Sequence, residues 1–316
     1  MSVQGHELQG STDWVWQNPL PQGNDIFDVK SLDDPQSVVA VCGAGSVLRS
    51  SDLGVSWQVA YHVAGFGGAL RAVAYPSLAT IVAVGDSGVV VISTDGGTQW
   101  SRTRLRSSGV TLQGISFFNS QVGLVVGDSG LIYATTNQGV SWEPQASGTG
   151  ARLRGVFTRT NGTAWVCGDG GTILKTTDRG AGWAALLNIN TQNLNRPFFL
   201  NDSVGWCVGD AGTIRTTSNG GLTWNPQVSH TILSLYAVTF FDLTRGAVAG
   251  GSGTGGILVS TTDGGATWNG GTTTTAFAVR DMRFEKFPPG VTPNSVGWYV
   301  GDHGGIAVST TGASGW

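Results

Sequence analysis

Three arginines and a tyrosine stand at equivalent points of an internal repeat in this sequence. Arg71, Arg154, Tyr236 and Arg280 each follow an apolar residue that opens a short apolar run. The other copies of the repeat hold Phe27, Gln113 and Asn195 at this point. Guanidinium groups bind carboxylates through paired hydrogen bonds, so the set predicts a site for an anionic ligand. The alternative is that these polar side chains only fill a hydrated channel.

Acidic residues recur in a second pattern, Gly-Asp-x-Gly, in five of the copies. The acid lies fifteen residues further along in four of them and 22 in the last. These acids are expected on the same face as the arginines, where they could bind cations. Residues repeated in most copies usually serve the turn itself, because Asp and Gly suit tight turns. The three cysteines, Cys42, Cys167 and Cys207, lack metal-ligand spacing and are expected as buried thiols. We therefore predict no metal site and no cofactor.

The elements that position these residues follow from the repeat itself. From Trp16 onward, a tryptophan closes each unit after 41 to 48 residues, at Trp57, Trp100, Trp142, Trp183, Trp224, Trp268 and Trp316. Short apolar runs separated by Gly-rich turns fill each unit and leave no room for helices. This period is typical of four-stranded propeller blades. We predict an all-β, seven-bladed β-propeller over residues 14–316, with residues 1–13 as a leader.

Closure of the ring is predicted from the two ends of the chain. The last unit ends at Trp316 and lacks an outer strand, whereas residues 14–19 match the outer strands that begin at Trp142 and Trp224. An open propeller would expose an unpaired edge. The N-terminal segment is therefore expected to supply the outer strand of the last blade.

Composition restricts the class of protein. Glycine contributes 50 of 316 residues and charged residues only 12%, which favours strands over helices. The net charge of −3 argues against a general nucleic-acid binder. No apolar run is long enough for a transmembrane helix, and the first residues lack the features of a signal peptide. The location therefore stays open between the cytoplasm, a particle and a mature exported fragment.

A second turn precedes each tryptophan and carries an acid at a fixed spacing. In four units a Ser or Thr, then Asp, then Gly lead to the Trp, with the acids at Asp52, Asp95, Asp178 and Asp263. Asn137 and Asn219 replace the acid in two others. Such a side chain can accept backbone N–H groups within its own turn. We interpret these residues as structural.

This spacing resembles the Asp-box, or BNR repeat, of sialidase-like, sortilin-like and photosystem II stability/assembly factor propellers. The strongest similarity is to the assembly-factor family, over residues 14–316, through Trp16-Gln-Asn-Pro-Leu-Pro21 and the unit at 205–224. That resemblance implies a non-catalytic scaffold. A sialidase would instead use an arginine triad and a tyrosine nucleophile, for which Arg71, Arg154, Arg280 and Tyr236 are the candidates. Its Arg-Ile-Pro motif is absent and the chain has three glutamates, so no catalytic residue is predicted.

Two features depart from the repeat and are candidates for partner contact. Arg102, Arg104 and Arg106 alternate along an outer strand and form a positive stripe. An insertion at 284–294 carries Phe287, Pro288 and Pro289 in a stiff loop. A loop at 65–68 is also expected to expose Phe66.

The sequence favours a protein-protein interaction scaffold that works within a larger assembly. One alternative is a structural or receptor-binding component of a virion or tail-like particle. The other is a glycan-binding or sialidase-like protein that uses the arginines.

Overall fold

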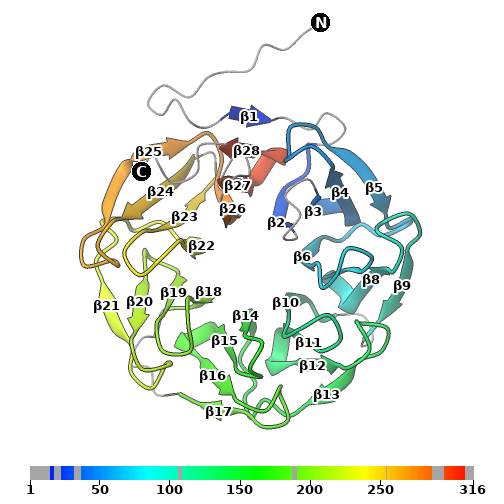
Figure 1. The fold of residues 1–316 in the computed structure, drawn as a ribbon, viewed down its shortest axis with the longest axis horizontal. Coiled ribbons are helices and arrows are strands. Elements are labelled where there is room, and N and C mark those ends of the chain that lie inside the picture. The colour runs from blue at the N-terminus through cyan, green and yellow to red at the C-terminus, as the bar shows by residue number, and fades with distance from the viewer. Residues whose placement is uncertain are drawn as a thin grey trace, which may run out of the picture.

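Seven four-stranded antiparallel sheets surround a central axis in the computed structural model (Figure 1). The structure describes residues 15–17, 23–31, 37–105, 109–186, 191–253, 255–286 and 295–309. The predicted all-β, seven-bladed propeller is confirmed. Each blade begins with an inner strand next to the axis and ends with an outer strand at the rim.

The blades follow the chain in order, and the strands of each blade succeed one another from the axis outward. Blade 1 consists of β2 (Ile26–Ser31), β3 (Val38–Cys42), β4 (Ser46–Ser50) and β5 (Gln58–His62). Blade 2 consists of β6 (Leu70–Ala74), β7 (Ile81–Gly85), β8 (Val89–Ser93) and β9 (Ser101–Arg104). Blade 3 consists of β10 (Leu112–Phe117), β11 (Gly123–Gly127), β12 (Ile132–Thr135) and β13 (Glu143–Gln145). Blade 4 consists of β14 (Leu153–Thr158), β15 (Ala164–Gly168), β16 (Ile173–Thr176) and β17 (Ala184–Ala185).

The remaining blades have the same plan. Blade 5 consists of β18 (Leu194–Phe199), β19 (Gly205–Gly209), β20 (Ile214–Thr217) and β21 (Asn225–Gln227). Blade 6 consists of β22 (Leu235–Phe240), β23 (Gly246–Ser252), β24 (Gly255–Thr261) and β25 (Asn269–Thr275). Blade 7 consists of β26 (Val279–Lys286), β27 (Ser295–Gly301), β28 (Ile306–Ser309) and β1 (Val15–Gln17). Single 3-10 turns link the second and third strands in five blades: η1 (Gly43–Gly45), η2 (Asp86–Gly88), η3 (Asp128–Gly130), η4 (Asp169–Gly171) and η5 (Asp302–Gly304).

The last blade takes its outer strand from the other end of the chain. β1 pairs antiparallel with β28, with Val15 opposite Val308 and Gln17 opposite Ile306. In Figure 1, β1 lies at the rim beside the final strands of the chain. This pairing covers an edge that would otherwise be open to another strand.

The core is divided among the junctions between blades. Seven apolar clusters of buried residues are each shared by two neighbouring blades, and blades 7 and 1 share one of them. A tryptophan that closes a unit packs in the junction with the preceding blade, as Trp57 does beside Trp298 of blade 7. Because the blades hold one another through these faces, the disc is a rigid support for its loops. In the part of the chain that the structure describes, no helix is long and apolar enough to cross a membrane.

Candidate functional site

The seven equivalent residues of the repeat line one cavity at the start of the inner strands. The cavity measures about 320 Å³ and opens at one end of the channel. Its lining includes Phe27, Arg71, Gln113, Arg154, Asn195, Tyr236 and Arg280. We call this cavity the mouth. The fold thus brings together every residue that the sequence placed at this position.

A β-bulge explains why these side chains face the channel. In every inner strand the register with the second strand shifts across the mouth residue, as between Leu70 and Ala72 or between Leu153 and Gly155. The extra residue in a bulge is left out of the ladder and its side chain is re-aimed. Arg71 and Arg154 are such extra residues, so the bulge turns them toward the axis.

Most mouth side chains bind the acid of the Gly-Asp-x-Gly turn in their own blade. Arg71 Nε donates to Asp86 Oδ1 at 2.9 Å, and Arg280 Nε donates to Asp302 Oδ1 at 2.5 Å. Arg154 forms the same ion pair with Asp169. These acids face the channel because the turn and the start of the inner strand lie at the same end of a blade.

Amide side chains make the equivalent contact in blades 3 and 5. Gln113 Nε2 donates to Asp128 Oδ1 at 3.1 Å, and Asn195 Nδ2 donates to Asp210 Oδ1 at 3.1 Å. Burial acts to raise the pKa of Asp210, but hydrogen bonds from Asn195 and Asn193 outweigh it and lower the pKa. The same opposition in Asp86, where Arg71 and the Ala69 amide donate, also leaves the pKa lowered. These acids are therefore anionic at neutral pH.

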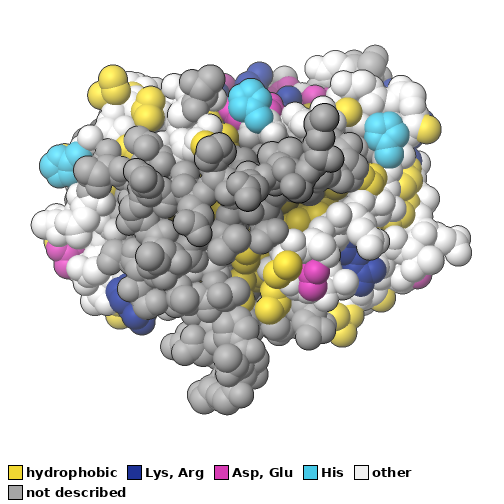
Figure 2. Space-filling model, turned by 90° about the horizontal axis from the view of Figure 1, so that it is seen from above, with side chains coloured by type: hydrophobic (Ala, Val, Ile, Leu, Met, Phe, Trp, Pro, Cys, Tyr) yellow, Lys and Arg dark blue, Asp and Glu magenta, His cyan; other side chains and the backbone are white. Residues whose placement is uncertain are grey.

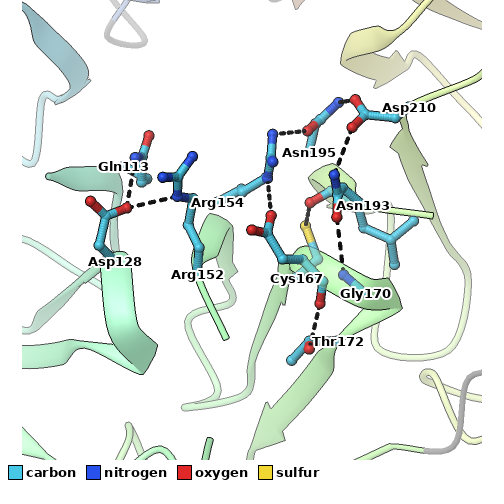
Figure 3. A network of polar contacts seen from close by, with 12 residues as sticks. Gln113, Asp128, Arg152, Arg154, Cys167, Gly170, Thr172, Asn193, Asn195 and Asp210 are labelled. Atoms are coloured by element: carbon cyan, nitrogen blue, oxygen red, sulfur yellow. Dashed lines mark hydrogen bonds and ion pairs between the residues drawn. The ribbon is translucent and has the colours of Figure 1, made fainter. Parts of the chain in front are cut away.

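Further contacts join blade 4 to its neighbours, blades 3 and 5 (Figure 3). Arg154 Nη1 donates to Asn195 Oδ1 of blade 5 at 3.1 Å. Arg152, which sequence reasoning missed, reaches from blade 4 to Asp128 of blade 3 at 2.9 Å and also lines the mouth. The matching position in the other copies, two residues before the mouth residue, never holds an arginine, so the repeat gave no reason to select Arg152.

The two aromatic residues of the mouth are covered by arginines. The guanidinium of Arg71 lies 4.8 Å from the ring centre of Phe27, and that of Arg280 lies 4.8 Å from the ring centre of Tyr236. These faces are occupied by cation–π contacts. Among the described residues, the lining holds no glutamate to activate Tyr236 as a nucleophile. The mouth therefore offers fixed N–H donors and carboxylate acceptors rather than free positive charge.

A second group of charges lies deeper in the channel and was missed from the sequence. The residue after the mouth residue is small in four blades: Ala72, Gly114, Gly155 and Ala237. In blades 1, 5 and 7 it is Asp28, Arg196 and Asp281. The signal that could have found them is this departure from a small-residue position at the axis, where space is scarce.

These residues and Lys30 form a cluster that we call the partition. Lys30 Nζ lies 2.5 Å from Asp28 Oδ1 and 3.0 Å from Asp281 Oδ2. Arg196 crosses from blade 5 and places Nη2 3.0 Å from Asp281 Oδ1 and 3.7 Å from Asp28 Oδ1. Arg196 lines the mouth, whereas Lys30 lines a separate cavity of about 280 Å³. The four charges therefore separate two hollows of the channel.

The two acids of the partition are nearly inaccessible and their pKa values are shifted in opposite directions. The side chains of Asp28 and Asp281 are 1% and 5% exposed. Burial, opposed by Lys30 and assisted by the charge of Asp281, raises the pKa of Asp28 to about 7. Burial also acts on Asp281, but Arg196 and Lys30 outweigh it and lower the pKa. Two close carboxyl groups commonly divide in this way, because one proton shared between them removes their repulsion.

Hydrogen bonds also join these acids to neighbouring blades. Asp28 Oδ2 accepts the amide of Val73 in blade 2 at 2.9 Å. Asp281 Oδ2 accepts the amide of Val29 in blade 1 at 3.2 Å. The partition therefore lies where blade 7 meets the beginning of the ring.

The four acids that sequence reasoning assigned to structural turns lie at the opposite end of the blades, in exposed turns. In the first turn Ser56 N donates to Asp52 Oδ1 at 2.8 Å, and Trp57 Nε1 donates to the Gly54 carbonyl at 2.9 Å. Equivalent backbone bonds reach Asp95, Asp178 and Asp263. Hydrogen bonds from Thr267, chiefly from its hydroxyl, lower the pKa of Asp263 to about 2.

The candidate partner residues divide into described and undescribed groups. Arg102 and Arg104 are exposed on β9, while Arg106, Phe287, Pro288 and Pro289 lie outside the described residues. The expectation for Phe66 is wrong, since it is 8% exposed. It packs in the junction of blades 1 and 2 beside Val63, because glycines on both sides let the loop fold inward.

Comparison with known proteins relates this geometry to a family. Residues 70–188 match the family described as photosynthesis system II assembly factor YCF48. Comparison of the sequence with curated proteins found no match.

Solved structures share the fold across nearly the whole chain. YCF48 from Cyanidioschyzon merolae is 19% identical, with a TM-score of 0.72, over 94% of this chain and 99% of its own. A structure described as YCF48 bound to D1 peptide is 17% identical, with a TM-score of 0.74, over 98% and 99%. The GH74 enzyme of Niastella koreensis is 15% identical, with a TM-score of 0.71, over 92% and 53%. The family match over residues 70–188 supports the resemblance found in the sequence for that part of the chain, and the solved structures share the seven-bladed fold of the whole.

Proposed function

We propose that this protein is a non-catalytic scaffold that binds another protein at the face of the disc where the mouth opens. The observation that carries the proposal is the match of residues 70–188 to an assembly-factor family. A YCF48 structure with the same fold is described as bound to a peptide, which supports a protein ligand. Since fold alone does not determine function, the chemistry of the surface must also suit a protein partner.

Exposed apolar side chains on the mouth face support a protein partner. Ile232 is 89% exposed and Val228 69%, in the loop from β21 to β22. Both line a shallow hollow with Ala211 and Gly212, which belong to the turn next to Asp210 of the mouth network. Along the rim seen in Figure 2, hydrophobic side chains form small separate groups on the described part of the surface. Buried apolar anchors contribute most to protein interfaces, so Ile232 is our principal contact.

The mouth would contribute orientation to such an interface. Its arginines are paired with aspartates, so they add little net attraction for an acidic ligand. Their remaining N–H groups and the amides of Gln113 and Asn195 are held in fixed positions by the network. Fixed donors and acceptors suit the amides and carbonyls of a peptide segment.

The stripe on β9 is a second proposed contact. Arg102 and Arg104 are exposed on an outer strand, and Arg106 continues the pattern. Exposed charges of one sign steer an acidic partner and weaken with salt. We include Phe287, Pro288 and Pro289 in the proposal on their sequence alone.

The decisive experiment compares capture of partners by matched surface variants. Tagged protein is used to capture proteins from its native source at low and high salt, and they are identified by mass spectrometry. Ile232→Ser should lose the specific partner. Leu222→Ser should keep it, because Leu222 is 64% exposed at the opposite end of the same blade.

Three results would contradict the proposal. One is the absence of any stoichiometric partner at both salt concentrations. Another is equal capture by the two variants. The third is specific binding of the protein to a glycan array, abolished by Arg154→Met, which would favour the glycan alternative. A partner from a virion or tail-like particle would instead keep the scaffold and identify its assembly.

A further inference from the structure

The partition closes the floor of the mouth with a charge that faces the cavity. Arg196 lines the mouth, and 27% of its side-chain surface is exposed. Its Nη2 atom is held from below by Asp281 at 3.0 Å, while Asp28 lies beyond hydrogen-bond distance at 3.7 Å. Two acids and two bases make the partition neutral when both carboxyl groups are ionised. Loss of one negative charge would leave one positive charge in excess, at the floor of the cavity.

The groups that face Asp28 can be followed strand by strand. Lys30 approaches it from β2, Asp281 from β26 and Arg196 from β18. From β6 it receives only the Val73 amide, because Arg71 of that strand is directed to Asp86. Among these groups, Lys30 and Arg196 are strong bases and Asp281 is held as the anion by both. Asp28 is therefore the member of the partition that changes charge near neutral pH.

We infer that the floor of the mouth is a proton-dependent binding site for a small oxyanion, with Arg196 as its ligand-contacting residue. Uptake of one proton by the carboxyl pair leaves Lys30 and Arg196 sharing the single negative charge of Asp281. The partition then carries a net positive charge, which an oxyanion in the mouth balances through Arg196. A guanidinium offers paired donors to carboxylate, sulfate or phosphate oxygens. The mouth, at about 320 Å³, has room for an ion of this size. The mouth residues Arg71, Arg154 and Arg280 do not serve in this way, because each pairs with an aspartate of its own, whereas Arg196 shares Asp281 with Lys30.

Burial sets the pH range in which Asp28 gains or loses its proton. The pKa of Asp28 is raised to about 7, so the proton binds and leaves within the neutral range. The side chain of Asp28 is 1% exposed, so its carboxyl group is removed from bulk water.

Sulfate is a suitable probe because it stays dianionic between pH 5.5 and pH 8. Equilibrium dialysis with labelled sulfate at constant ionic strength measures its affinity for the full chain. We expect binding at least tenfold tighter at pH 5.5 than at pH 8. Asp28→Asn, which imitates the protonated acid, should bind equally at both pH values and as tightly as the wild type at pH 5.5.

Two arginine variants identify the binding residue. Arg196→Leu should lose sulfate binding at both pH values, whereas Arg159→Leu should bind like the wild type. Arg159 pairs with Asp202 away from the mouth and is the matched control. If Arg196→Leu does not fold, Arg196→Lys and Asp28→Asn still test the site, since the first keeps the charge and loses the paired donors. Equal affinity of the wild type at both pH values, or unchanged binding by a folded Arg196 variant that lacks the guanidinium, would overturn the inference.

Discussion

The stability of the protein should fall as the pH rises through neutrality, because Asp28 binds a proton more tightly when folded. Its pKa rises from 3.8 to about 7 on burial. The folded state then holds more protons than the unfolded state between these values. Stability from this group is present at acid pH and is lost as the pH rises through the folded pKa.

The size of the effect follows from the same pKa. Each pKa unit is worth about 1.36 kcal/mol, so the full contribution of Asp28 is about 4 kcal/mol. About 3 kcal/mol of it is lost between pH 5 and pH 8 by the same linkage. Asp281, whose pKa is lowered, acts in the opposite direction but only at more acid pH. The free energy of unfolding should therefore be about 3 kcal/mol lower at pH 8 than at pH 5 through Asp28 alone.

Urea unfolding at constant ionic strength, followed by tryptophan fluorescence, measures this difference. Asp28→Asn keeps an oxygen for the Val73 amide and cannot ionise. It should flatten the pH dependence and be about 4 kcal/mol more stable than the wild type at pH 8, because it keeps the full contribution of the protonated acid. Asp242→Asn, in an exposed ion pair with Arg245, should leave the pH dependence unchanged. Parallel pH curves for the wild type and Asp28→Asn would refute the reasoning, as would a wild type that gains stability toward pH 8.

Three further predictions concern the scaffold. Gly168→Ala should prevent folding or strongly lower the melting temperature, because its Cβ would lie 2.1 Å from a backbone carbonyl oxygen. Gly150→Ala, which has open space around the new Cβ, should leave the melting temperature unchanged. Trp165→Phe should cost about 1 kcal/mol more in urea unfolding than Trp206→Phe. The buried Trp165 indole donates a hydrogen bond at 3.0 Å, whereas the buried Trp206 indole has no hydrogen-bond partner within the described ranges of the chain. Asp263→Ala should lower the melting temperature more than Asp263→Asn, because Asn137 and Asn219 accept the same backbone bond in other blades.

The arrangement of strands and turns in a blade could be predicted from the sequence because the same pattern occurs in several copies. The tryptophan spacing indicated the number of blades, and the turn residues indicated the strand ends. Aligning the copies also placed Arg71, Arg154, Tyr236 and Arg280 on one cavity. An alignment within one chain predicts positions around a ring, since equivalent residues in equivalent blades must lie at equal distances from the axis.

Pairing and burial could not be predicted in the same way. The sequence showed arginines and turn acids separately, and only the folded blade brings Arg71 within 2.9 Å of Asp86. The site for an anionic ligand that was expected at the mouth therefore loses much of its free positive charge. Phe66 was misjudged for a related reason, because glycine neighbours permit an inward turn as readily as an exposed one.

The residues of the partition were missed because the repeat draws attention to positions that are alike in most blades. These residues instead differ from the other blades at a shared position. Asp28, Arg196 and Asp281 occupy a position that is Ala or Gly in the other blades. A small residue there is explained by crowding, since a Cβ on Gly155 would lie 2.6 Å from the Asn195 carbonyl oxygen. A charged residue at the same position needs a compensating partner from another blade. The three charged residues at this position compensate one another across the channel and therefore form one unit. In a propeller, residues that differ from the repeat at a shared position are the first candidates for a site.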